Sequence, residues 1–94
     1  MKAMIYMPLQ GESLEEIEKR REKAKRRLER QGYEVVGLWD EFVKWKLEEK
    51  DWRKEEKMLE ECQKVWMGTG WQNESRGRKI RKKAEELEIE VEDE

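Results

Sequence analysis

The chain has 94 residues and a formal net charge of −2, with 22 Lys and Arg against 24 Asp and Glu, so it has room for one small core. Its composition is 49% charged and 35% hydrophobic, but five Trp and aliphatic residues at regular spacings argue against disorder. With no His and a single Cys, the sequence excludes Ser-His-Asp and Cys-His catalysis, His-ligated metals, a zinc cluster and an internal disulfide.

The N-terminal third predicts a strand followed by a helix. Residues 3–7 (AMIYM) have the composition of a short buried strand, and Pro8 ends it because proline lacks a backbone N–H. Ser13 and Glu16 form the S-x-x-E capping box that opens a helix. Gly32 is typical of the residue just beyond a helix end. The inward face of this helix is predicted to carry Leu14, Ile17, Arg21, Ala24 and Leu28.

The rest of the chain continues the alternation. Residues 33–38 predict a second strand, and 40–62 fit one broken helix or two short ones, with Asp51 as a candidate N-cap. Trp39, Trp45 and Trp52 in this region indicate either core packing or a partner-binding face. Residues 64–68 predict a third strand, 75–87 a helix and 89–92 an edge strand. The single domain, 1–94, is therefore predicted to be α/β: a small doubly wound (Rossmann-like), mostly parallel four-stranded sheet with helices on both faces.

Two loops at the carboxyl ends of the predicted strands have the composition of a binding site. The second, residues 68–78, is the richer: Gly68 and Gly70 allow close backbone approach, and Trp71 offers a flat face to a base or sugar. Its polar residues include Arg76, Arg78 and, in the following helix, Arg81, a guanidinium set suited to phosphate. The alternative is a turn of small residues with a packing Trp and solvated cations. Cys62 is interpreted as a small core residue.

The order of these pieces resembles the nucleoside 2-deoxyribosyltransferase-like superfamily, above all its short, often phage-encoded members of unknown function. In the first loop, residues 6–11, Pro8-Leu9-Gln10-Gly11 matches their Pro-Met/Leu-x-Gly loop, and Gly32 to Val36 matches their Gly-Tyr-Glu-Val-Val strand. Gly70-Trp71 and the Arg76-Gly77 turn match their motifs before the last helix. The resemblance covers nearly the whole chain, with residues 39–57 aligning only loosely.

The resemblance implies a nucleoside or nucleotide bound between the two loops, and many relatives assemble as homodimers or larger homo-oligomers. Active relatives use a Glu on the last helix as nucleophile, but here that position falls on Arg81, or on Ile80 when counted from the helix end. Arg stays protonated and cannot attack an anomeric carbon. Glu74 and Glu12 are the remaining candidate carboxylates, and both are expected to be exposed. The predicted ligand-binding residues are Tyr6, Pro8, Gln10, Gly11, Gly68, Gly70, Trp71, Ser75, Arg76, Gly77, Arg78 and Arg81.

Three functions fit this sequence. The first is a nucleotide- or nucleoside-binding module without the nucleophilic Glu, which sequesters a nucleotide signal. The second is a transferase or hydrolase of the N-glycosidic bond of nucleosides or their monophosphates. The third is a structural or interaction protein, or a redesigned scaffold without catalysis. We expect a cytoplasmic protein with no cofactor, no metal and no membrane span, and the near-neutral charge and acidic tail disfavour nucleic acid as a partner.

Overall fold

Strands and helices alternate along the chain in the computed structural model, which describes residues 1–8, 13–36 and 53–94. The strands are β1 (Lys2–Tyr6), β2 (Glu34–Val35), β3 (Lys64–Met67) and β4 (Glu90–Asp93). The helices are α1 (Leu14–Arg30), α3 (Arg53–Glu60) and α4 (Ser75–Glu86), with a 3-10 turn, η1 (Trp71–Asn73), before α4. Trp39, Trp45, Asp51 and Trp52 lie outside the described residues, so the predictions made for them are not addressed.

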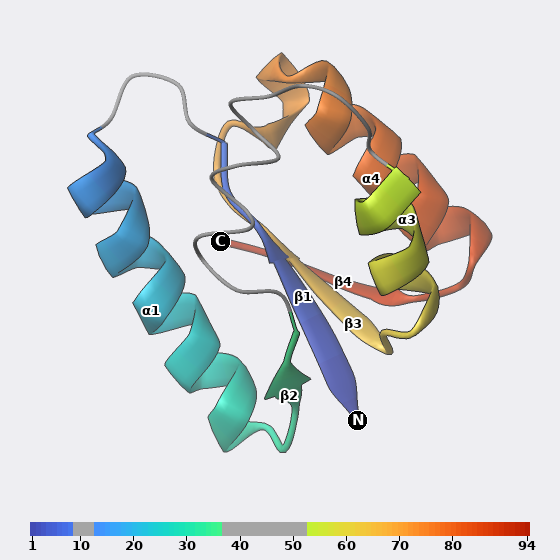
Figure 1. Ribbon diagram of the computed structural model, residues 1–94, viewed down its shortest axis with the longest axis horizontal. Helices are drawn as coiled ribbons and strands as arrows, with labels where there is room; N and C mark the ends of the chain where they lie inside the picture. The colour runs from blue at the N-terminus through green and yellow to red at the C-terminus, as the bar shows by residue number, and fades with distance from the viewer. Residues whose placement is uncertain (9–12, 37–52) are drawn as a thin grey trace.

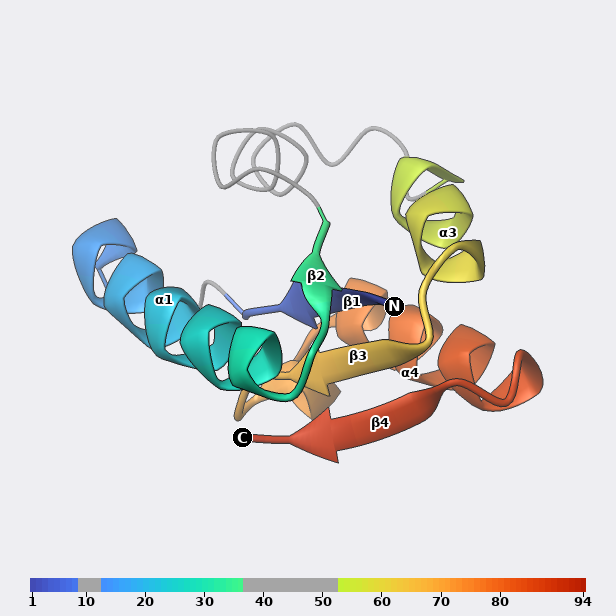
Figure 2. The ribbon, with the colours of Figure 1, turned by 90° about the horizontal axis from the view of Figure 1, so that it is seen from below.

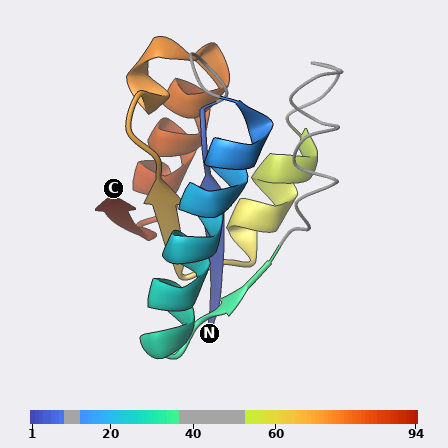
Figure 3. The same ribbon diagram turned by 90° about the vertical axis from the view of Figure 1, so that its left-hand side faces the viewer.

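The four strands form one parallel sheet in the order β2-β1-β3-β4. Figure 3 shows β2 and β4 at opposite edges with β1 and β3 between them. Figure 2 shows β4 running along its edge of the sheet to the C-terminus. The chain moves from β1 to β2 on one side and then crosses to β3 on the other, which is the doubly wound arrangement that the sequence predicts.

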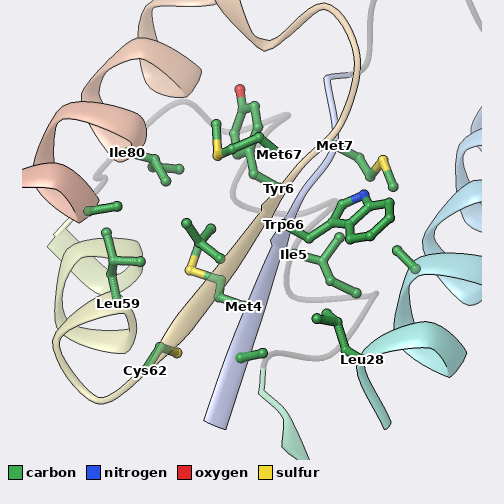
Figure 4. Packing of buried hydrophobic residues seen from close by; sticks show 14 of the residues in the cluster. Met4, Ile5, Tyr6, Met7, Leu28, Leu59, Cys62, Trp66, Met67 and Ile80 are labelled. Atoms are coloured by element: carbon green, nitrogen blue, oxygen red, sulfur yellow. The ribbon is translucent and has the colours of Figure 1, made fainter. Parts of the chain in front are cut away.

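The core has two apolar layers, one on each face of the sheet. Figure 1 shows α1 on one side of the strands and α3 and α4 on the other. Because successive strand residues point to opposite faces, Ile5 and Trp66 turn toward α1, while Met4, Tyr6 and Met67 turn toward α3 and α4 (Figure 4). Leu28 closes the first layer, and Leu59 and Ile80 close the second. Within the described ranges, every helix is too short or too polar to span a membrane.

Helix α1 confirms most of the predicted inward face. Ser13 caps it by accepting a hydrogen bond from the Glu16 backbone N–H at 3.2 Å. Leu14 is the exception, with 47% of its surface exposed. At about 100° per residue, Leu14 lies about 50° from the centre of the buried stripe, so it falls at the margin of the core. The buried residues of the helix are Ile17, Arg21, Ala24 and Leu28.

Most element boundaries differ from the predicted ones by a residue, and β2 is shorter than predicted: it covers Glu34–Val35 where the sequence predicts 33–38, of which 37 and 38 lie outside the described residues. β1 begins at Lys2 because Lys2 pairs with Glu34, and β4 extends to Asp93 because Asp93 pairs with Met67. α4 ends at Glu86, which leaves Leu87 as its C-cap with 38% of its surface exposed, not packed inward. The ends of β1 and β4 depend on which strands are their neighbours in the sheet. A single segment of sequence does not carry that information.

Candidate functional site

The loops after β1 and β3 meet at the carboxyl edge of the sheet. The Gly68 backbone N–H donates to the Tyr6 carbonyl oxygen at 2.7 Å. A Cβ on Gly68 would lie 2.6 Å from the Met7 sulfur and 3.1 Å from Pro8 Cδ. Met7 and Pro8 therefore pack into the space that a side chain at position 68 would occupy, so this space is not open to a ligand. Gln10, Gly11 and Glu12 lie outside the described residues.

Tyr6 and Glu74 form a hydrogen-bonded pair beneath the second loop. The Tyr6 side chain is fully buried, and its hydroxyl donates to a carboxylate oxygen of Glu74. Glu74 is half-buried, so the expectation that it is exposed is wrong. The physical reason is that a buried phenol requires an acceptor, and the sequence does not reveal that Tyr6 lies below this turn. Gly77 is buried beside them, where a Cβ would collide with the Trp71 carbonyl oxygen.

The arginines of α4 do not converge on one point. Arg78 Nη1 donates to the Gln72 carbonyl oxygen at 2.7 Å, which ties α4 to η1. The Arg81 guanidinium stacks over the Trp71 ring at 4.9 Å and donates from Nη1 to Asp93 Oδ1 at 2.7 Å. Its Nε also donates to Glu85 at 3.3 Å. Arg81 is predicted to attract a phosphate, but its charge is matched by carboxylates of its own chain. Ser75 is exposed and Arg76 is half-buried.

A hollow of about 370 Å³ opens where β3 and β4 end. Three predicted site residues line it: Gly70, Trp71 and Arg81. Its remaining lining comes from residues outside the predicted set, Met67, Thr69, Gln72, Asp93 and Glu94. Asp93 and Glu94 reach this edge because β4 pairs in parallel with β3, with Asp93 opposite Met67. The other predicted site residues that the structure describes do not line the hollow: Tyr6, Pro8, Gly68, Ser75, Arg76, Gly77 and Arg78.

The Glu94 carboxylate is held at the rim of this hollow by three donors. Arg20 of α1 donates from Nε to Oε2 at 3.1 Å and from Nη2 to Oε1. The Thr69 backbone N–H donates to Oε1 at 2.9 Å. The Arg20 hydrogen bond, together with those from Thr69, outweighs partial burial and holds the pKa of Glu94 below its ordinary value. The sequence alone does not predict these contacts, because Arg20 and Thr69 are 74 and 25 residues away from Glu94 along the chain.

Cys62 is a buried core residue, as the sequence predicts. Its thiol donates to the Met58 carbonyl oxygen at 3.2 Å. Burial raises the pKa of the Cys62 thiol to about 11, so the reactive thiolate is scarce at neutral pH. Within the part of the chain that the structure describes, no three His, Cys, Asp or Glu side chains gather as metal ligands would.

The chain matches no family model, no curated protein and no solved structure. Function is therefore inferred from the geometry at the carboxyl edge of the sheet.

Proposed function

We propose that the chain binds a nucleoside or nucleotide in the hollow at the ends of β3 and β4. The observation that carries this proposal is the stacked Trp71 and Arg81 pair, 4.9 Å apart, lining a hollow of about 370 Å³. In parallel α/β sheets, ligands bind beyond the carboxyl ends of the strands, and small-molecule sites begin at about 300 Å³. A base stacks well on an indole or on the plane of a guanidinium.

The charges around the hollow favour the nucleoside part of such a ligand. Arg81 is paired with Asp93 at 2.7 Å, and Glu94 is paired with Arg20, so these contacts leave no unmatched charge. Carboxylate oxygens accept hydrogen bonds and suit the hydroxyl groups of a sugar. Gln72 also lines the hollow, and a glutamine side chain carries the donor and acceptor groups that recognise a base edge.

The resemblance to the nucleoside 2-deoxyribosyltransferase-like superfamily supports binding without transfer. In active members of that superfamily a nucleophilic Glu lies at a position that falls here on Arg81, or on Ile80 when counted from the helix end, and neither is acidic. A guanidinium that stacks on Trp71 and pairs with Asp93 contributes a flat cationic surface, not a nucleophile. We therefore propose a module that holds a nucleoside or nucleotide and sequesters it.

The test is a titration of the isotope-labelled protein with deoxynucleosides, followed through the Gly70 amide and the Trp71 indole N–H. We expect saturable shifts with a dissociation constant below about 1 mM. Arg81→Gln should weaken binding at least about tenfold. Lys82→Gln is the matched control, because Lys82 is an exposed cation on the same helix that does not line the hollow. Absence of any saturable shift up to several millimolar, or equal losses in the two variants, would contradict the proposal.

A second candidate, cleavage or transfer of the N-glycosidic bond, has one observation in its favour. Two acidic residues, Asp93 and Glu94, line the hollow, and glycosidic bond cleavage commonly uses two carboxylates. Long incubation with deoxynucleosides and their monophosphates, with free base measured by chromatography, tests it. Base release that disappears in Asp93→Asn and persists in Glu90→Gln would establish this function in place of binding alone.

A further inference from the structure

The contacts of Glu94 have the geometry of an anion held in a site. Both carboxylate oxygens are engaged: Oε2 by Arg20 Nε, and Oε1 by Arg20 Nη2 and the Thr69 backbone N–H. Two nitrogens of one guanidinium and one backbone N–H pointing at adjacent oxygens form the arrangement that recognises phosphate groups in proteins. We call this set of donors, Arg20 with the Thr69 N–H, the anion site.

The anion site differs from an ordinary surface ion pair in its shielding. Only 23% of the Arg20 side chain and 25% of the Glu94 side chain are exposed. The interaction is therefore screened less by water and salt than a pair of fully exposed side chains. The site also borders the hollow, because Thr69 and Glu94 belong to its lining. A ligand in the hollow would have its own anionic group within reach of the same donors.

The acidic residues near the anion site do not prevent a second anion from binding. Asp93 is paired with Arg81 at 2.7 Å. Glu92 is paired with Arg27 and with Lys64, each at 2.6 Å. Glu94 is thus the carboxylate that another anion would displace from the Arg20 and Thr69 donors.

We propose that the anion site binds a phosphate group of the ligand, and that the Glu94 carboxylate fills the site as an internal substitute until that phosphate displaces it. The ligand's identity rests on the proposed function, but the anion site itself does not. In this arrangement the nucleoside part occupies the hollow, and the phosphate lies on the Arg20 side of it. Glu94 then lowers the affinity for phosphate-bearing ligands relative to what the donors alone would give.

The test is a titration with inorganic phosphate at constant ionic strength, followed by the Thr69 amide signal. We expect Glu94→Ala to bind phosphate at least about tenfold more tightly than the wild type, because the competing carboxylate is gone. Glu90→Ala is the matched control: it removes the same charge at the start of β4, four residues before Glu94, and Glu90 does not line the hollow. Glu94→Gln keeps an acceptor for Thr69 and should show a smaller gain. Arg20→Gln in the Glu94→Ala background should abolish the gain.

Several outcomes separate this inference from the proposed function. The anion site is overturned if Glu94→Ala and Glu90→Ala bind phosphate equally well, or if the gain in phosphate affinity persists when Arg20→Gln is added. This holds whether or not nucleosides bind. Nucleosides could bind the wild type while a nucleoside monophosphate binds Glu94→Ala no more tightly than the nucleoside itself does. In that case the proposed function stands and this inference fails. If phosphate binds tightly in Glu94→Ala and no nucleoside binds, the anion site stands and the proposed function fails.

Discussion

At the scale of single residues, two helices of this chain end in the same way with different residues. After α1, the Gly32 and Tyr33 backbone N–H groups donate back to the carbonyls of Glu29 and Leu28, and Gly32 has φ +92°. After α4, Glu88 and Ile89 donate in the same pattern, and Glu88 has φ 57°. Both ends are Schellman motifs, which require a left-handed residue. Gly32 adopts that conformation without a steric penalty, whereas Glu88 carries a Cβ.

We therefore expect Glu88→Gly to stabilise the protein by about 0.5–1 kcal/mol, since relief of the Cβ clash exceeds the added entropy of the unfolded chain. Glu86→Gly is the control, because Glu86 is the last residue of α4 and is also exposed. There, glycine should destabilise by up to about 1 kcal/mol. Urea unfolding of the three proteins measures both effects. A loss of stability in Glu88→Gly would contradict this account.

At the scale of elements, α1 packs on the sheet with two chemically different sides. Its apolar stripe covers β1 and β3, and beside that stripe its polar residues meet the acidic face of β4. Arg20 pairs with Glu94, and Arg27 pairs with Glu92 at 2.6 Å. Lys64 of β3 lies beneath this contact with 6% of its side chain exposed, 2.6 Å from Glu92. Glu92 therefore joins α1, β3 and β4.

Removing the Glu92 charge should destabilise the fold by about 1–3 kcal/mol, because a buried cation loses its nearest partner. We expect this of Glu92→Gln. Glu90→Gln provides the comparison, since Glu90 also faces Lys64 but at 3.7 Å and with 62% of its side chain exposed. It should change the free energy of unfolding by less than about 0.5 kcal/mol. Equal effects of the two substitutions in chemical denaturation would show that Lys64 does not depend on Glu92.

The two sides of α1 also mark what the sequence can and cannot predict. Ile17, Ala24 and Leu28 recur at helical spacing, so the apolar side is visible in the sequence alone. The polar side is not, because Arg20 and Glu94 are 74 residues apart and meet only through the order of the strands. The same reason applies at the candidate site. The composition of the second loop indicates Trp71 and Arg81, but Asp93 enters the site through the pairing of β4 with β3.

At the scale of the whole molecule, the acidic C-terminal segment provides partners for cations of several elements. Glu85 and Asp93 pair with Arg81 of α4, Glu92 with Lys64 of β3, and Glu94 with Arg20 of α1. Although the net charge is only −2, the charges are arranged specifically: acidic residues of the C-terminal segment pair with cations on both faces of the sheet. Stability should therefore depend on pH at both ends of the scale.

The direction in which stability changes with pH follows from the pKa shifts of three groups, Glu92, Glu94 and Lys64. Burial raises the pKa of Glu92, but its hydrogen bond and charge contact with Lys64 outweigh burial and lower it, and the Arg20 hydrogen bond lowers the pKa of Glu94. These two groups stabilise the fold fully above their unfolded pKa, about 4.5, and this contribution is lost as the pH falls through the folded pKa. Burial lowers the pKa of Lys64, but Glu92 outweighs it, so the net pKa is raised. The contribution of Lys64 is full below about 10.5 and is lost as the pH rises above it.

Two substitutions in the acidic C-terminal segment separate these contributions. Thermal melts from pH 2 to pH 11 should show a plateau between the two limits and a fall at each end. Glu94→Gln should flatten the acid limb alone, because Glu94 has no contact with Lys64 among the interactions that the structure describes. Glu92→Gln should flatten both limbs, because the raised pKa of Lys64 depends on Glu92. An alkaline limb that is equally steep in both variants would mean that the stability linked to Lys64 arises elsewhere than at this strand.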